Sequence, residues 1–171
     1  TKKKILNIKK SIEKNKKIKV EMAKKTHYIS EIKGLENLEK LEELRLSGNR
    51  ITQINGLIHL KELKILALSH NQISNLQGIE NLGRLEELYV AGNQITQING
   101  INSLRNLKIL DLSHNQISEL QGIENLGRLE ELYISYNKIS EQQIKKLKKI
   151  NQFLKINANR FLPSYHKECL S

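Results

Sequence analysis

Aliphatic residues recur along most of this chain in a single frame that repeats every 22 residues. The clearest copy covers residues 101–123 and reads INSLRNLKILDLSHNQISELQGI. In the regular copies, apolar residues stand five and three positions before an asparagine, and two, five, eight, eleven and fourteen positions after it. The asparagines that set this frame are Asn49, Asn71, Asn93, Asn115, Asn137 and Asn159. A fixed period of this length indicates a solenoid of stacked coils.

Two different spacings within each unit predict its local structure. The apolar pair before the asparagine has a period of two, which predicts a short strand with both side chains on one face. The spacing of three after the asparagine favours tight turns or 3₁₀ helix over α-helix. Each unit is therefore predicted to form one turn of a right-handed coil. Stacking the units gives a parallel sheet on the concave side and 3₁₀ or irregular coils on the convex side.

The N-terminal residues depart from this frame. Residues 3–16 predict a short helix with one apolar stripe on a lysine-rich surface, and residues 18–22 predict a strand that begins a degenerate first coil. We interpret the helix as a cap, because the first coil of a solenoid otherwise exposes its core and its strand edge. The alternative is a basic amphipathic helix that binds a membrane surface or an acidic partner.

The frame also breaks after Asn137. Ser140 followed by Gln143 is a capping-box start, and residues 141–150 then predict an α-helix with Ile144, Leu147 and Ile150 facing inward. We therefore expect a single domain with a basic N-terminal cap and first coil in residues 1–29, regular repeats in residues 30–140, and a helix-containing last repeat and C-terminal cap in residues 141–171.

The repeated motif LxxLxxLxLxxNxIxxIxGL resembles the 22-residue leucine-rich repeat of the protein phosphatase 1 regulatory-subunit class. The residues that carry it are Leu104, Leu107, Leu110, Leu112, Asn115, Ile117, Leu120, Gly122 and Ile123. The resemblance covers roughly residues 30–162. It implies an α/β solenoid, a right-handed leucine-rich-repeat superhelix, and residues 160–171 resemble the C-terminal cap of this class. Bacterial surface repeats of similar length usually carry proline at the glycine positions, so the glycines disfavour that group.

Family resemblance also implies three kinds of partner. Residues 129–140, LEELYISYNKIS, are similar to a stretch of the axonemal dynein leucine-rich light chain. This similarity implies a scaffold associated with dynein or microtubules, in the cytoplasm and cilium. The first alternative is a regulatory subunit of a protein phosphatase. The second is a ribonucleoprotein-associated scaffold, because the spliceosomal A-prime protein carries the same repeat, and a nuclear location stays open with it.

The charge distribution separates the ends of the chain from its body. Residues 1–33 hold 12 Lys/Arg and 3 Asp/Glu, residues 34–140 hold 10 and 13, and residues 141–171 hold 7 and 2. The basic ends would suit an acidic surface such as tubulin. This distribution argues against a nucleic-acid partner, because the repeated face itself is not basic. No apolar run reaches the length of a membrane span, and Cys169 is the single cysteine, which favours a reducing, cytoplasmic compartment.

Candidate catalytic and metal-binding groups do not assemble into a site. His70 and His114 occupy equivalent positions two units apart, which places them about 10 Å apart at the usual strand spacing, too far for one zinc ion. The cysteine and the serines have no base placed beside them, and the paired glutamates recur as a solvated column. We therefore expect no enzyme activity, no metal and no cofactor.

The strand positions that face away from the core predict the binding surface. Tyrosines flank an aspartate there and isoleucines stand beside them, and tyrosine and arginine are common at binding hot spots. We predict that a partner protein binds this concave face through Arg45, Glu43, Tyr89, Glu87, Asp111, Ile109, Tyr133, Glu131, Tyr136 and Lys155. The alternative is that these side chains only pack along their own columns. The asparagine column is expected to be a structural ladder that bonds backbone groups within and between coils.

Overall fold

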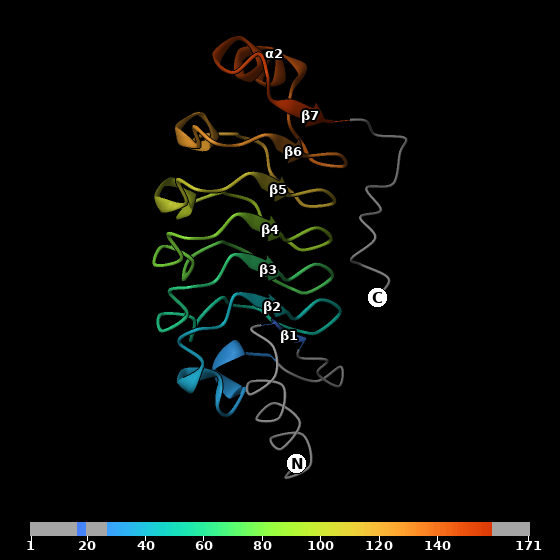
Figure 1. The fold of residues 1–171 in the computed structure, drawn as a ribbon. Helices are drawn as coiled ribbons and strands as arrows, with labels where there is room; N and C mark the ends of the chain where they lie inside the picture. The colour runs from blue at the N-terminus through green and yellow to red at the C-terminus, as the bar shows by residue number, and fades with distance from the viewer. Residues whose placement is uncertain (1–16, 20–26, 159–171) are drawn as a thin grey trace.

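The computed structural model describes residues 17–19 and 27–158, and in it the chain forms one stack of coils (Figure 1). Seven strands form a single parallel sheet in chain order. The strands are β1 (Lys17–Lys19), β2 (Glu43–Arg45), β3 (Ile65–Ala67), β4 (Glu87–Tyr89), β5 (Ile109–Asp111), β6 (Glu131–Tyr133) and β7 (Lys155–Asn157). The predicted parallel sheet is confirmed.

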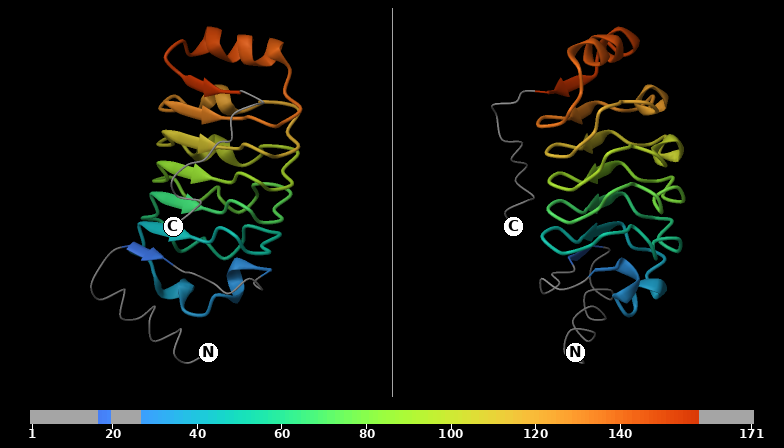
Figure 2. Two further views of the ribbon diagram at one scale, coloured as in Figure 1. Left: turned by 90° about the vertical axis from the view of Figure 1, so that its right-hand side faces the viewer. Right: turned by 180° about the vertical axis from the view of Figure 1, so that it is seen from behind.

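The predicted 3₁₀ structure lies on the side opposite the sheet (Figure 2). The 3₁₀ helices are Ile29–Glu31, Leu35–Asn37, Ile101–Ser103 and Ile123–Asn125. Three of them follow a glycine in the left-handed region, which are Gly34, Gly100 and Gly122. Glycine closes this bend because it has no Cβ to clash at positive φ.

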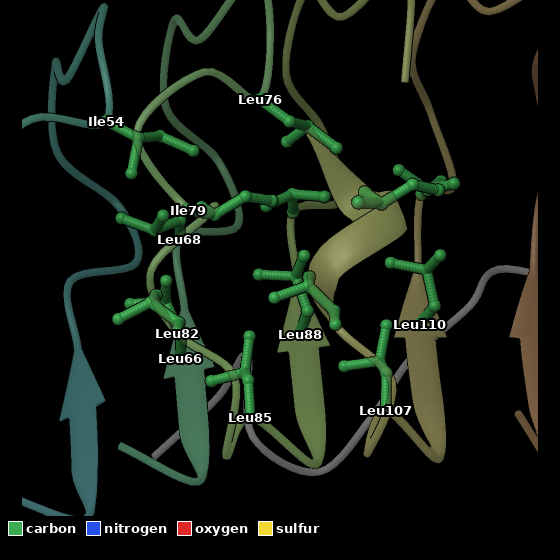
Figure 3. Close-up of a cluster of buried hydrophobic side chains, with 14 of the residues drawn as sticks. Ile54, Leu66, Leu68, Leu76, Ile79, Leu82, Leu85, Leu88, Leu107 and Leu110 are labelled. Atoms are coloured by element: carbon green, nitrogen blue, oxygen red, sulfur yellow. The ribbon is translucent and has the colours of Figure 1, made fainter. Parts of the chain in front are cut away.

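The core consists almost entirely of aliphatic side chains that stack from coil to coil. Leu66, Leu88 and Leu110 are fully buried and form one row across β3, β4 and β5, and Leu85 and Leu107 form a second row (Figure 3). Each buried leucine contributes roughly 1.5–3 kcal/mol relative to an exposed one. Because each coil buries its apolar face only against its neighbours, the units stabilise each other along the stack.

The asparagine column joins each coil to the preceding one through buried hydrogen bonds. Asn71 Nδ2 donates to Leu68 O in its own coil at 2.9 Å and to Leu46 O in the coil before it at 3.0 Å. Its Oδ1 accepts from the Ile51 N–H at 3.0 Å. The same pattern of bonds recurs at Asn93, Asn115 and Asn137. Asn159 lies outside the described residues.

The predicted helix at the end of the regular repeats is confirmed as α2 (Glu141–Ile150). Leu147 is buried and Ile144 is partly buried against the core, but Ile150 is 55% exposed, so its predicted inward orientation is wrong. At 3.6 residues per turn, two steps of three residues carry Ile150 about 120° around the helix from Ile144. Ile150 therefore leaves the buried face.

Both bonds of the predicted capping box are present at the start of α2. The Gln143 N–H donates to Ser140 Oγ, and the Ser140 N–H donates to Gln143 Oε1. We expect Ser140→Ala to lower the free energy of unfolding by about 1 kcal/mol, the usual contribution of an N-cap side chain. Urea denaturation followed by circular dichroism measures this change. Ser140→Asp is the control, because aspartate also caps helices, and an equal loss in both variants would contradict the capping role.

The strand after α2 is two residues out of the 22-residue register. The Cα partner of Glu131 is Lys155 and that of Tyr133 is Asn157, so Lys155 does not continue the column of Tyr133 as the repeat predicts. An α-helix rises about 1.5 Å per residue and a 3₁₀ helix about 2.0 Å, so a coil that contains an α-helix needs more residues to span the same side. The helix therefore shifts the strand that follows it.

Several predictions for the chain ends lie largely outside the described residues. The capping helix at residues 3–16 and the C-terminal cap at residues 160–171 belong to this group. β1 contains residues 18 and 19 of the strand predicted at residues 18–22, and residues 20–22 lie outside the described residues. Among the described residues, none of the helices has the length and apolarity that crossing a bilayer requires.

Candidate functional site

The strands bring most of the predicted binding residues onto one face in adjacent register. Tyr89 pairs with Asp111, and Asp111 pairs with Tyr133. In a second column, Ile65, Glu87, Ile109 and Glu131 follow one another across β3 to β6. Their alternate neighbours, such as Leu88 and Leu110, point into the core. The sheet face therefore carries a mixed column of apolar and acidic side chains beside a column of tyrosine and aspartate.

Polar side chains on this face bond to each other within a strand. The hydroxyl of Tyr133 donates to Glu131 Oε2 at 2.7 Å, and Tyr89 donates to Glu87 Oε2 at 2.8 Å. On β2, Arg45 Nε lies 2.5 Å from Glu43 Oε1. These pairs hold the side chains in fixed positions, so the face is rigid before any partner binds. These side chains thus also bond to one another on the sheet face, which is compatible with a structural role for them.

Burial of this face is deeper than the alternation predicts. The prediction of exposure is wrong for Glu43, Tyr89 and Asp111, whose exposed fractions are 7%, 6% and 1%. Asp111 is shorter than the tyrosines in register on both sides, and its Oδ1 accepts from the Ser113 N–H at 3.0 Å. The half-buried members of the predicted site are Arg45, Glu87, Ile109, Glu131 and Tyr133, and the exposed members are Tyr136 and Lys155.

Burial raises the pKa of the Tyr133 phenol to about 12, and its hydrogen bond to Glu131 acts in the same direction. Because the folded-state pKa is raised from 10.0, the stabilising contribution of Tyr133 is fully present below about pH 10 and is lost as the pH rises through about 12. We expect the free energy of unfolding to fall across this interval and Tyr133→Phe to fall less. Tyrosinate absorbance measures the ionisation directly. A step near pH 12 that persists in Tyr133→Phe would contradict this assignment.

Ion pairs between coils lie on the loops that precede the strands. Lys64 Nζ lies 3.1 Å from Glu42 Oε2, and Lys108 Nζ lies 2.6 Å from Glu86 Oε2. The hydrogen bond from Lys108 lowers the pKa of the Glu86 carboxyl below its usual range. These residues are partly exposed, so the pairs contribute little stability. The doublets Glu42–Glu43 and Glu86–Glu87 thus each have their first member in one of these surface pairs.

The loops that follow the strands contain a feature that sequence reasoning missed. His70, His114 and Tyr136 have φ values of 57°, 53° and 55°, in the left-handed region that non-glycine residues rarely adopt. They are exposed, and the rings of His114 and Tyr136 stack with centroids 4.1 Å apart. The sequence could have indicated this left-handed backbone, because Gly48 and Gly92 occupy the same position in other coils.

Metal-ligating groups are scattered over the part of the chain that the structure describes. No group of three or more His, Cys, Asp or Glu residues there could hold a metal ion. A surface hollow between α2 and the preceding coil is lined mainly by Glu119, Leu120, Glu124, Lys146, Leu147 and Ile150. It has no nucleophile with a base and an orienting group beside it, so it does not assemble the groups that covalent catalysis requires.

Comparison with known proteins identifies the repeat along the chain. Family models described as leucine-rich repeat match residues 40–60 and 83–139, and one described as two copies of the leucine-rich repeat matches residues 61–103. No curated protein matches the chain. None of the three family models specifies the phosphatase-regulatory class that the motif resembles.

Solved structures that are similar to this chain include two proteins from bacteria. An internalin from Listeria monocytogenes is 27% identical, with a TM-score of 0.68 over 75% of this chain and 38% of the internalin. A leucine-rich-repeat protein from Leptospira interrogans is 29% identical, with a TM-score of 0.59 over 72% of this chain and 38% of that protein. The chain thus spans well under half of each. Both proteins are bacterial, whereas the glycines of the repeat led us to expect less similarity to bacterial surface repeats.

Proposed function

We propose that this chain, which is a leucine-rich-repeat protein, is a non-enzymatic scaffold that binds another protein on its concave sheet. Proteins of this kind are generally interaction scaffolds. The observation that carries the proposal is the column in which Ile65 and Ile109 alternate in register with Glu87 and Glu131. The two isoleucines remain half-buried on a face where a soluble coil would carry polar residues.

Rigidity of the sheet face supports binding. The backbone is fixed by six parallel strand pairings, and hydrogen bonds within the strands fix the tyrosine and glutamate side chains. A preformed surface loses little conformational entropy when a partner binds, so more of the contact energy appears as affinity. Contacts to the partner are assigned to the half-buried and exposed members of the predicted site and not to Glu43, Tyr89 or Asp111.

The family resemblance supports our proposals for the partner. Our first proposal is a dynein- or microtubule-associated protein in the cytoplasm or cilium, with the basic lysines of α2 and β7 facing an acidic surface. A protein phosphatase and a ribonucleoprotein component are the alternatives. Lys145, Lys146, Lys148, Lys149 and Lys155 are all exposed, which suits an acidic partner at this end.

Site-specific cross-linking tests the proposal. A photoreactive phenylalanine analogue is placed at Ile109 or Ile65 on the sheet, and at Gln97 on a convex coil as a matched control, in lysate of the source organism. We expect the two sheet positions to cross-link one common protein and Gln97 not to cross-link it. Circular dichroism of each variant checks folding. Cross-linking of that protein from Gln97 but from neither sheet position would reject the concave face.

A further inference from the structure

The loops that follow β2 to β6 form a second surface, which we call the strand-end rim. It comprises residues 46–52, 68–74, 90–96, 112–118 and 134–140. In these five loops, the position before the asparagine adopts a left-handed backbone, with φ values from 53° to 72°. Its occupants in chain order are Gly48, His70, Gly92, His114 and Tyr136. One backbone position is therefore filled by glycine in two coils and by a ring in three.

Rings at this position are not required by the turn. Gly48 and Gly92 show that glycine closes the same turn without the steric penalty that a side chain meets at positive φ. Tyr136 is the clearest case, because a bulky residue in this region is an outlier. Strained residues of this kind persist where the surrounding structure holds them, and they gather at binding sites.

The rings are held at the surface in defined positions. A Cβ added at Gly92 would lie 2.7 Å from Nδ1 of His70. The His70 ring therefore lies against the Gly92 backbone, and it fits there because Gly92 has no side chain. His114 stacks on Tyr136 with an interplanar angle of 15°. Tyr136 is 38% exposed, and His70 and His114 are exposed. The rim thus presents three ordered rings to solvent.

Charge on the rim has one sign. None of its five segments contains Asp or Glu, whereas Arg50 and Lys138 are both exposed at its two ends. The exposed residues between the rings include Gln72, Gln94 and Gln116. The rim resembles antibody binding loops in composition, because both contain serine, glycine, asparagine, tyrosine and arginine. Antibody loops combine rigid rings with adaptable hydrogen-bonding groups.

We infer that the strand-end rim binds an extended acidic segment of a partner protein. This inference rests on the proposed scaffold function and adds a second contact surface to it. Arg50 and Lys138 stand four coils apart, about 19 Å at the usual strand spacing of about 4.8 Å, and an extended chain covers this distance in about six residues. The rim therefore selects two carboxylates about six residues apart, with the segment between them lying over the rings.

A nucleic acid fits the rim less well than a protein segment. Binding of single strands requires a continuous basic groove that follows the phosphates. The rim has cationic side chains only at its ends, separated by neutral amides. Two separated charges match two separated carboxylates.

The test uses a display library of random dodecapeptides selected on the wild-type chain. The peptides recovered are then measured on His70→Gly/His114→Gly/Tyr136→Gly, in which glycine removes the rings and keeps the backbone of the sister coils. We expect enrichment of paired carboxylates at the stated spacing and at least a tenfold loss of affinity in this variant, the size of effect expected at a hot spot. We also expect its melting temperature not to fall, which separates a binding role from a structural one.

A pair of charge variants supplies the matched control. Arg50→Glu/Lys138→Glu should weaken the selected peptides, whereas Lys40→Glu/Lys61→Glu, which changes the net charge equally on the other edge, should not. The proposal that the strand-end rim binds an acidic segment would be overturned by any of three results. These are an equal loss of affinity in the two charge variants, selected peptides without carboxylates, and no enrichment of any peptide. Peptides lost on Ile109→Ser but retained by the glycine variant would also overturn it while leaving the concave-face proposal standing. A labelled RNA oligonucleotide that binds where the peptides fail would assign the rim to nucleic acid instead.

Discussion

Gly78→Ala is expected to lower the free energy of unfolding by about 3–5 kcal/mol, from backbone strain and overpacking together. Gly78 has a φ of 102°, and a Cβ built on it would lie 1.6 Å from the carbonyl oxygen of Ile54 in the preceding coil. The atom that it meets belongs to the backbone, so no side-chain rotation relieves the contact. Urea denaturation followed by circular dichroism measures the loss.

Two other glycines separate the causes of this effect. Gly34 has a φ of 91°, and no atom of the described residues lies within 4 Å of its Cβ position, so Gly34→Ala should cost only about 1 kcal/mol, the strain alone. Gly83 has open space and no left-handed φ, so Gly83→Ala should be neutral or stabilising by up to about 1 kcal/mol. If Gly78→Ala costs no more than Gly34→Ala, the close approach of the two coils is not what requires glycine there.

Asn93→Ala is expected to lower the free energy of unfolding by about 2–4 kcal/mol. The buried Ile73 N–H loses its partner, which costs about 1–3 kcal/mol, and Leu68 O and Val90 O each lose one of two side-chain donors. Asn93 Nδ2 donates to Val90 O at 2.9 Å and to Leu68 O at 3.0 Å, and its Oδ1 accepts from the Ile73 N–H at 3.0 Å. Alanine replaces none of these bonds. Since the bonds reach into the preceding coil, the loss also weakens the coupling between coils.

Asn99→Ala is the matched control for Asn93→Ala. Asn99 is exposed and bonds only to the neighbouring Gln97 side chain among the described contacts, so its loss should fall within about 0.5 kcal/mol. Equilibrium denaturation of both variants gives the difference. Equal stability of the two variants would mean that the ladder does not support the stack.

Repetition explains why the fold could be predicted well. Spacing alone predicts the inward leucines of β2 to β6, and all of them are buried as expected: Leu44, Leu66, Leu88, Leu110 and Leu132. The helix at residues 141–150 was also predicted from the Ser140 cap and the apolar spacing. The orientation of its last residue, Ile150, was predicted wrongly, because the helical period carries Ile150 about 120° from Ile144 and leaves it 55% exposed.

The candidate site could be predicted only in its outline. Alternation along each strand places Tyr133 and Ile109 on the sheet face, but it gives no measure of how far longer neighbours cover a short one such as Asp111. The rings of the strand-end rim were missed for a different reason. Their unusual feature is the backbone conformation of His70 and Tyr136, which shows in the sequence only by comparison with Gly48 and Gly92.

The sequence by itself determined the coil, its period, the inward and outward positions and the asparagine ladder. These are local properties repeated many times, so each copy reinforces the same interpretation. The tertiary structure decided the two-residue shift of β7, the burial of Asp111 and the left-handed rings. Each of these features depends on the position of one coil relative to the next. That position depends on helix rise and side-chain length, which the pattern of apolar and polar residues does not encode.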